Sequence, residues 1–519
     1  MAGYTAFRND FMTTDLLSPE KFSQLEARRL RYGVMFAMYE NTAYSDIHRW
    51  AASYRSKNGL YKYIRNIYNP SYRIGEFWKA SLLGGKLDPD AGDGQAVSSA
   101  LPILTESEDV RRAIAQLWKW SKWQGKKDVL SLQGAILGDA VIKVVDDTQR
   151  EKVYLSVVHP SSIKDVELDA WGNVKGYVIE EKRPDPRSSR DDRTCTYLEV
   201  AERDETENIQ YSTYLDGQLY DWNGQGAKWS EPYGFVPMVM FQHNDVGLEY
   251  GWSELYPGLS KFREVDDLAS KLSDQIRKAV AAPWLLGMKK PETTPRAKGA
   301  AKTDEAPQPG RDEIPMLYAG DGKAASATPL VAPLDIAATA AYIKDILADI
   351  EQDYPELSAD LHNVQGDISG RALRINRAPA EKKVLQRRPN YDAAVAQAQM
   401  MALAIGGMRG YQNFETFSLD SFAQGALDHS IGDRPVFARD PLDDLEEEKM
   451  FWTVGVQAKS FGVPPLEWLR ANGEKYGYDE DRIAKIEASP EYRARMAALE
   501  ASTQAVKAGT LPGSNNGGK

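Results

Sequence analysis

Two helical patterns separated by a proline-rich insertion, between Gly251 and Gly410, constrain the fold of this 519-residue chain more than any other feature. In the first pattern, apolar residues recur at steps of three and four, the spacing of one helix face. Pro283 ends this pattern, and the residues from there to Pro333 include eight prolines, which no helix can cross. A second apolar run then follows with the steps of a heptad seam. The first run consists of Leu255, Leu259, Phe262, Val265, Leu268, Leu272, Ile276 and Val280, and the second of Ile336, Ala340, Ile343, Leu347, Ile350 and Tyr354.

The two runs predict a pair of long helices. At ~1.5 Å of rise per residue, about thirty residues after Gly251 make a rod of roughly 45 Å. Because the insertion 283–333 lies between them, we expect the helices to be antiparallel, with the insertion as a small sheet and loops at their far end. Two helices alone leave part of each apolar seam uncovered. We therefore expect other copies of the chain to complete these seams.

A loop and a strongly basic helix complete the stretch. Residues 355–370, PELSADLHNVQGDISG, indicate a break and a loop with Ser369 as the N-cap of the next helix. Residues 371–388 carry seven basic side chains against one acidic side chain. Pro379 is expected to kink this helix, and Pro389 to disturb it again. Two interpretations of the basic charge stay open: the helix faces DNA, or it pairs with acidic surfaces of a neighbouring subunit.

The rest of the chain indicates an α+β fold that is mainly helical. Residues 1–127 show aromatic and apolar residues at helical spacing. Between Ala140 and Trp222 the pattern changes to short alternating segments separated by turn residues, which predicts an antiparallel meander. Asp440-Pro441 and the acids that follow predict the start of another helix, because acids favour the positive end of the helix dipole.

Charge and composition narrow the classes of function. A net charge of −11 and a pI of 5.3 argue against a protein that grips nucleic acid over its whole surface. They are compatible with a surface past which DNA slides. The single cysteine, Cys195, cannot form an internal disulfide and suits a reducing compartment. We expect no membrane-spanning helix, since no run of about 18 apolar residues occurs. We expect no secretory signal either, because the first residues show no basic region followed by an apolar core.

Motifs of catalysis are missing from the sequence. The five histidines lie too far apart for metal-ligand spacing, and the phosphate-binding patterns GxxxxGK[ST] and GxGxxG and the nucleophile pattern GxSxG do not occur. His159, which precedes Pro160 at a strand end, is interpreted as structural rather than as a general base. We therefore expect no enzymatic activity and no cofactor. The alternative hypothesis is a cytoplasmic enzyme of unfamiliar fold with its site in the 140–245 strand region.

Four short segments resemble the portal proteins of tailed double-stranded DNA bacteriophages, in particular siphophage-like head-tail connectors. These proteins form the ring at one capsid vertex through which DNA enters and leaves. Residues 250–255, YGWSEL, are similar to the start of the portal stem helix, and residues 366–373, GDISGRAL, to the segment after the tunnel loop. Residues 440–444, DPLDD, resemble the start of the crown, and residues 138–144, GDAVIKV, the first strand of the wing sheet. The order of these segments covers nearly the whole chain.

The resemblance implies a portal fold with wing, stem, clip and crown, assembled as a ring. It divides the chain into seven segments. The first is a wing at 1–245, which is helical at first and has antiparallel strands from about 140. Stem helix one at 246–282, a clip at 283–333, stem helix two at 334–354 and a tunnel loop at 355–368 follow, and then a kinked helix and remaining wing at 369–440 and a helical crown with a disordered tail at 441–519.

The resemblance also implies which residues line the channel. The tunnel loop has no lysine or arginine, so that phosphates find little to bind there; its channel-lining candidates are Asp360, His362, Asn363, Val364, Gln365 and Asp367. The candidates for the channel-facing side of the stem are Lys261, Lys271 and Lys278. As a separate group outside the channel-lining candidates, the resemblance marks Ser369, Gly370, Arg371 and Pro379 as residues of the kinked helix. No catalytic and no metal-binding residue is expected.

Portal proteins work as rings, typically of twelve subunits, in genome packaging, head-tail joining and DNA ejection. The expected partners are therefore other copies of the chain, the terminase large subunit, a head-tail adaptor, the major capsid and scaffolding proteins, and double-stranded DNA in transit, with no membrane. The expected location is the portal vertex of the virion, after assembly in the host cytoplasm. A different virion component, such as a head-tail adaptor, is a third interpretation that the chain length and the two-helix stem disfavour.

Overall fold

The structure is a computed structural model, and the chain is an α+β protein with more helix than strand, as the sequence predicted. It forms two compact units, Met1–Phe437 and Ala438–Lys519, each of which is described by itself. The residues that the structure describes are 23–43, 68–88, 101–188, 193–222, 224, 226–280, 284–287, 316–318, 326–329, 335–358, 370–437 and 441–507.

Antiparallel sheets occupy the middle of the first unit. Strand β2 (Asp139–Asp147) lies between β3 (Lys152–Val158) and β10 (Met238–Gln242) in a three-stranded sheet. A six-stranded sheet follows, with the order β4 (Ile163–Leu168), β5 (Val174–Pro184), β6 (Thr194–Arg203), β7 (Ile209–Leu215) and β8 (Gln218–Leu219), and with β9 (Lys228–Glu231) paired to β7. Burial alternates along β6 and β7, as expected for strands with one packed face. The predicted antiparallel strands are present, but they divide between two sheets instead of forming one meander, and the pattern had not indicated β4, β9 and β10.

Helices pack around these sheets. They are α3 (Leu25–Tyr39), α5 (Pro70–Ser81), α6 (Glu108–Ser121), α7 (Trp123–Leu137), α11 (Gly370–Arg409) and α12 (Leu419–Ala423), and a short pairing of β1 (Ile103–Leu104) with β14 (Ser430–Ile431) joins distant parts of the chain. Helix α6 starts where the Ser107 hydroxyl accepts a hydrogen bond from the Val110 amide. Trp78 and Trp123 are fully buried in the core that these helices share.

Helix α11 runs as one element of 40 residues through both of its prolines. The expected disturbance at Pro389 does not end the helix. Each proline removes the hydrogen bond to the carbonyl four residues earlier, and those residues, Ile375 and Leu385, are 65% and 45% exposed. Both freed carbonyl groups thus belong to partly exposed residues, and the helix continues through both prolines.

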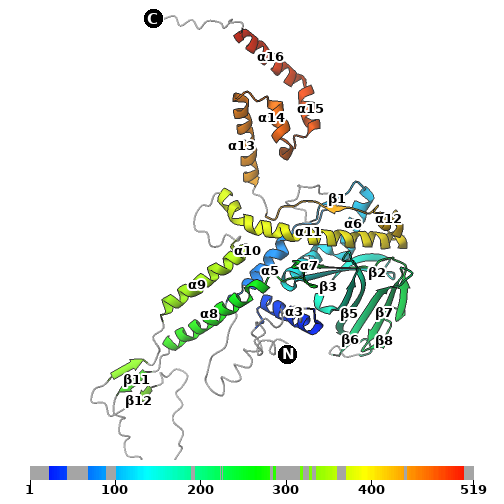
Figure 1. Ribbon diagram of the computed structural model, residues 1–519, viewed down its shortest axis with the longest axis vertical. Helices are drawn as coiled ribbons and strands as arrows, with labels where there is room; N and C mark the ends of the chain where they lie inside the picture. The colour runs from blue at the N-terminus through cyan, green and yellow to red at the C-terminus, as the bar shows by residue number, and fades with distance from the viewer. Residues whose placement is uncertain are drawn as a thin grey trace, which may run out of the picture. The chain divides into compact units, whose positions relative to one another are not determined.

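Two helices of the first unit form an antiparallel pair (Figure 1). Helix α8 (Leu259–Val280) follows a 3-10 turn, η3 (Tyr256–Gly258), and α9 (Ile336–Asp353) follows the insertion. Lys261 near the start of α8 is 2.6 Å from Asp353 at the end of α9, which fixes the antiparallel direction. Between the two helices in sequence, β11 (Trp284–Gly287) pairs with β12 (Met316–Tyr318) and β13 (Ser326–Pro329). The predicted pair of helices and small sheet are thus present, and we call α8 and α9 the hairpin.

Burial of the apolar seams falls along the hairpin. Near its base, Phe262 and Val265 of α8 and Ile350 of α9 are at most 2% exposed. Toward the inserted sheet, Ile276 is 41% and Ile336 is 42% exposed. The first unit therefore covers the base of the seams and leaves their far ends open.

The second unit is a small helical bundle. Helix α13 (Pro441–Ser460) begins with Pro441 at its first position, as predicted, and is followed by α14 (Pro465–Asn472), η5 (Glu474–Tyr476), α15 (Glu480–Ala488) and α16 (Pro490–Lys507). Its core consists of Phe451, Leu469 and Ile483. Ser489 before Pro490 takes an extended conformation that separates α15 from α16.

Candidate functional site

Two of the segments singled out in the sequence, GDAVIKV and YGWSEL, meet at a close backbone crossing. Gly138 ends α7 with a φ of 96°, and its carbonyl oxygen would lie 1.9 Å from a Cβ added to Gly251. A Cβ on Gly138 would in turn lie 2.3 Å from the Gly251 carbonyl oxygen. The Gly251 amide donates to Oδ1 of Asp139 at 2.7 Å. Both positions therefore require glycine, since the backbones touch.

The residues after Gly251 satisfy the free carbonyl groups at the end of α7. The Ser253 hydroxyl donates to the Ile136 carbonyl at 2.6 Å, and the Glu254 amide donates to the Ala135 carbonyl at 3.0 Å. This anchoring holds the segment outside helical geometry. It explains why α8 begins at Leu259 and has 22 residues, about 33 Å, instead of the longer rod expected from Gly251.

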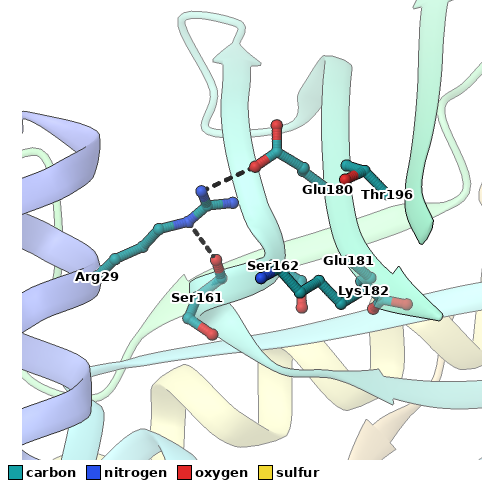
Figure 2. Close-up of a pocket in the computed structure, with 7 residues that line it drawn as sticks. All are labelled: Arg29, Ser161, Ser162, Glu180, Glu181, Lys182 and Thr196. Carbon is teal, nitrogen blue, oxygen red and sulfur yellow. Dashed lines mark hydrogen bonds and ion pairs between the residues drawn. The ribbon is translucent and has the colours of Figure 1, made fainter. Parts of the chain in front are cut away.

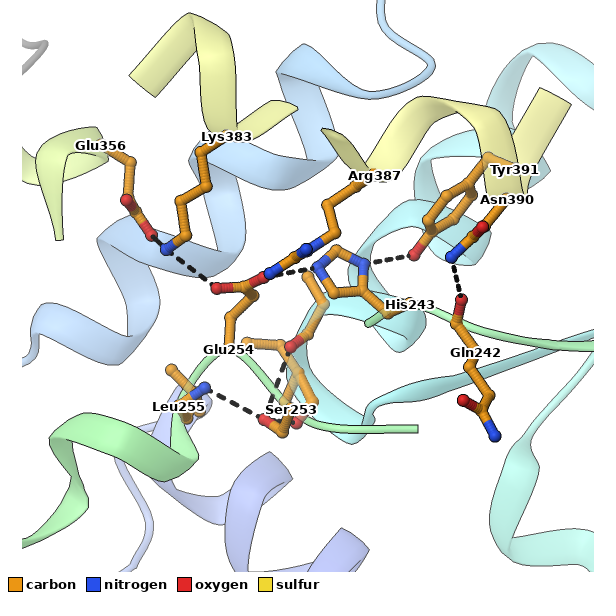
Figure 3. A network of polar contacts seen from close by, with 12 residues as sticks. Gln242, His243, Ser253, Glu254, Leu255, Glu356, Lys383, Arg387, Asn390 and Tyr391 are labelled. Carbon is orange, nitrogen blue, oxygen red and sulfur yellow. Dashed lines mark hydrogen bonds and ion pairs between the residues drawn. The ribbon is translucent and has the colours of Figure 1, made fainter. Parts of the chain in front are cut away.

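Glu254 is the centre of a buried polar network that we call the junction (Figure 3). Its carboxylate accepts from Nζ of Lys383 at 2.8 Å and from Nε of Arg387 at 3.0 Å, one turn apart on α11. Lys383 also reaches Oε1 of Glu356 at 2.8 Å. Glu356 belongs to α10 (Pro355–Ser358), which directly follows α9. The junction therefore joins the base of the hairpin to α11.

A histidine and a tyrosine extend the junction into the core. His243 follows β10, is fully buried, and has Nε2 3.1 Å from Glu254 and Nδ1 2.7 Å from the hydroxyl of Tyr391. Burial lowers the pKa of His243, so the ring is neutral at pH 7. The neutral ring then donates to Glu254 from Nε2 and accepts from Tyr391 at Nδ1. The hydroxyl of Tyr354 adds a hydrogen bond to the Glu254 carbonyl at 3.0 Å.

The charges of the junction are matched. Burial opposes ionisation of Glu254, but the hydrogen bond from His243 and the charges of Lys383 and Arg387 outweigh it and hold the pKa of Glu254 well below its usual range. Burial also disfavours a charged Lys383, yet the Glu254 and Glu356 carboxylates raise the pKa of this lysine. Such a network is costly to break at one member, because a buried charge then loses its partner.

The junction decides part of the open question about the basic helix. Lys383 and Arg387 pair with acids of the same chain, which was neither of the two interpretations drawn from the sequence. Arg388 is buried and donates to the carbonyl groups of Arg434, Ser81 and Pro435. Within α11 these three cations therefore hold the chain's own segments together. Lys382 is exposed, and its contact with DNA or a neighbour stays a prediction.

The predicted channel residues are only partly described. Lys261 pairs with Asp353 across the hairpin, and Lys271 pairs with Asp267 one turn before it on α8. The side chains of Lys278 and Arg371 and all of Ser369 lie outside the described residues, as do the tunnel-loop candidates Asp360, His362, Asn363, Val364, Gln365 and Asp367. Gly370 starts α11, and Pro379 lies within it at an exposed position. The expected loop is helical at its start, because residues 355–358 form α10.

A polar pocket lies in the strand region, which is where the enzyme alternative places its site (Figure 2). Arg29 of α3 donates to the Ser161 carbonyl and to Glu180, both at 2.9 Å, and Lys164 also donates to Glu180 at 3.0 Å. These bonds from Lys164 and Arg29 lower the pKa of Glu180, which makes it a poor base. The other lining residues are Ser162, Glu181, Lys182 and Thr196. Among the described lining residues, the Glu180 carboxylate is thus held by two cations.

His159 beside this pocket has a structural role. Its Nδ1 accepts from the Ser161 amide at 3.2 Å and lies 2.7 Å from the Ser161 hydroxyl, which caps the short 3-10 turn η2 (Pro160–Ser162). Burial lowers the pKa of His159. The interpretation of this histidine as structural is therefore consistent with its contacts.

Neither known protein families nor curated proteins give a match to this chain. Among the described residues, no group of His, Cys, Asp and Glu side chains is arranged to hold a metal ion. Within the same part of the chain, no helix is both long and apolar enough to cross a membrane.

Sequence reasoning had missed most members of the junction. Glu254 lay inside a quoted motif without a role, and His243, Glu356 and Tyr391 were not singled out. One usable signal existed: Lys383 and Arg387 are four residues apart and share a helix face, so they can hold one carboxylate between them. The sequence did not say which carboxylate.

Proposed function

We propose that the chain is the subunit of a ring-shaped portal, the channel at one capsid vertex of a tailed bacteriophage through which double-stranded DNA is packaged and ejected. The observation that carries the proposal is the hairpin itself. Two antiparallel helices bear a small inserted sheet at one end and are fixed at the other end by the buried charges of the junction. This is the arrangement that the resemblance implies for a stem and clip.

The open ends of the seams support association between copies. Ile276 and Ile336 are large apolar side chains that the described part of the chain leaves 41% and 42% exposed. Both side chains continue the apolar seams whose base is buried in the first unit. In a ring, the next subunit covers them through a head-to-tail contact.

The junction supports a mechanical role. A channel through which DNA is driven needs a stem whose direction is fixed relative to the surrounding domain. Three elements that are distant in sequence, the segment before α8, α10 after α9, and α11, are connected there by ion pairs shorter than about 3 Å.

Light scattering and negative-stain imaging of the purified chain test the proposal. The expected result is a ring with a central channel, and a stable monomer at high concentration in every buffer would overturn it. A double variant Ile276→Glu/Ile336→Glu is expected to weaken assembly, because it places charges in the covered seams. Leu168→Glu is the matched control, since Leu168 is 43% exposed on a strand outside the hairpin.

Removal of residues 292–312, which lie outside the described residues, tests the clip. Under the portal proposal, rings remain and binding of the terminase large subunit is lost. Loss of ring assembly instead would show that the insertion is not a peripheral docking element.

A further inference from the structure

A basic depression on the first unit shares no lining residue with the junction or with the strand-region pocket. It lies at the corner between α6 and α7, beside the segment that follows α5, and encloses about 630 Å³. Among the described residues, its lining includes three lysines and an apolar floor but no aspartate or glutamate: Lys86, Lys119, Lys122, Leu87, Ala115 and Trp118. All three lysines are exposed.

The depression is held in shape by backbone contacts. Oε1 of Gln124 accepts from the Leu87 amide at 2.9 Å, and its Nε2 donates to the Gly85 carbonyl at 3.0 Å. The one amide side chain thus binds the segment after α5 to the start of α7. Lys122 connects α6 to α7 in the left-handed conformation, with a φ of 51°. The positions from which the lysines extend are therefore set by the fold.

The positive charge of the depression is not neutralised within the described part of the chain. There, no ion pair involves Lys86, Lys119 or Lys122, whereas the nearby Lys79 pairs with Glu76 and Lys127 pairs with Asp128. The chain as a whole carries a net charge of −11. A local concentration of unpaired cations on an acidic protein attracts an acidic partner and repels a second basic one.

The floor distinguishes between kinds of acidic partner. Leu87 and Ala115 are half-buried, and Trp118 is 5% exposed. Bases of single-stranded nucleic acid stack on accessible aromatic faces, which a buried indole does not offer. An apolar floor inside a cationic rim fits instead a large apolar side chain flanked by carboxylates.

We propose that this depression docks an acidic segment of another protein, with one large apolar side chain on the floor and carboxylates at Lys86, Lys119 and Lys122. The lysines act as flexible point charges at the rim, and the apolar contact sets the register of the segment. The inference does not depend on the portal proposal, because it rests on a surface outside the hairpin and the junction.

Fluorescence anisotropy with the full chain tests the docking site. The probe is a labelled peptide of about ten residues in which glutamates and aspartates surround a central Leu-Phe pair. A second peptide replaces that pair by serines, and a labelled DNA duplex of about twenty base pairs serves as the phosphate probe. The variant Lys119→Gln/Lys122→Gln removes two rim charges, and Lys152→Gln/Lys228→Gln removes two exposed lysines of the strands as a matched control. Circular dichroism checks that both variants fold.

The expected result is saturable binding of the first peptide that weakens about tenfold in Lys119→Gln/Lys122→Gln and stays unchanged in the control, since two exposed charge pairs together contribute roughly that factor. The serine peptide should bind more weakly than the Leu-Phe peptide. Equal losses in both variants, equal binding of both peptides, or no saturable binding would overturn the proposal. Tighter binding of the duplex than of the peptide would also overturn it, since the surface would then recognise phosphate.

Discussion

Replacement of Glu254 by glutamine isolates the charge at the centre of the junction. The side chain keeps its size and one acceptor oxygen but loses the charge shared by Lys383 at 2.8 Å and Arg387 at 3.0 Å. Its new amide group also presents hydrogens to one of these two donors. Glu254 is 5% exposed, and the side chains of Lys383 and Arg387 are 19% and 18% exposed, so water can replace the lost partner only in part.

The expected loss follows from these contacts. Removing one partner of a buried ion pair costs about 3–5 kcal/mol. Lys383 retains Glu356 at 2.8 Å, which limits the damage to one of its two contacts. We therefore expect Glu254→Gln to lower the free energy of unfolding by about 3 kcal/mol at pH 7.

Urea unfolding followed by tryptophan fluorescence measures this loss at equal protein concentrations. Glu205→Gln is the control, because Glu205 is exposed and such surface changes shift stability by at most about 0.5 kcal/mol. The pKa of Glu254 is depressed in the folded chain, so its contribution is present above the ordinary value of 4.5 and is lost as the pH falls below it. The difference in free energy of unfolding between Glu254→Gln and the unmodified chain should therefore become smaller below about pH 4.5. A loss below 0.5 kcal/mol at pH 7, or one that does not change with pH, would refute the reasoning.

Three further predictions concern the backbone crossing, its buried carboxylate and the hairpin. Gly251→Ala should cost at least about 3 kcal/mol of unfolding free energy, because its Cβ would lie 1.9 Å from a carbonyl oxygen; Gly125→Ala in α7, where a Cβ meets nothing within 4 Å, should instead stabilise by up to about 1 kcal/mol. Burial raises the pKa of Asp139 to about 6, so folding favours its protonated form, and this contribution is lost as the pH rises from about 4 to 6. At pH 8, Asp139→Asn should therefore raise the free energy of unfolding by up to about 3 kcal/mol over that of the unmodified chain, and at pH 3 it should leave this free energy unchanged. Urea unfolding at both pH values measures the two differences, and an equal gain at both would contradict the raised pKa of Asp139. Ile276→Glu/Ile336→Glu should reduce the assembled fraction in sedimentation velocity while Leu168→Glu leaves it unchanged, and equal effects would argue against a role of the hairpin seams.

Local patterns explain which elements could be predicted. The hairpin helices and the antiparallel strands have strong periodicity and clear turn residues, and they are present in the structure, although α8 begins later than the sequence indicated. Errors arose where a local rule met a tertiary contact. Gly251 looked like a helix start, but its segment is bound to the end of α7. Pro389 was expected to disturb α11, but the helix continues through it.

The candidate site was much less accessible from sequence. Residues 138–144 and 250–255 were recognised as separate motifs, yet their glycines touch each other. The charges on α11 were counted correctly but assigned to DNA or a neighbouring subunit, whereas Lys383 and Arg387 have partners in the same chain. An ion pair between residues more than 100 positions apart leaves no periodic signal.

The sequence by itself determined the order of helix, proline-rich insertion, helix and long basic helix, because helix periodicity and proline geometry are local properties of the backbone. Only the tertiary structure decided where the hairpin is anchored. Chain folding brings together Glu254, Glu356, Lys383 and His243. The low dielectric of their buried surroundings strengthens the ion pairs and hydrogen bonds among them and makes the loss of any partner costly. The order from Gly251 to Gly410 thus specified the parts, and the burial of their charges specified how the parts are joined.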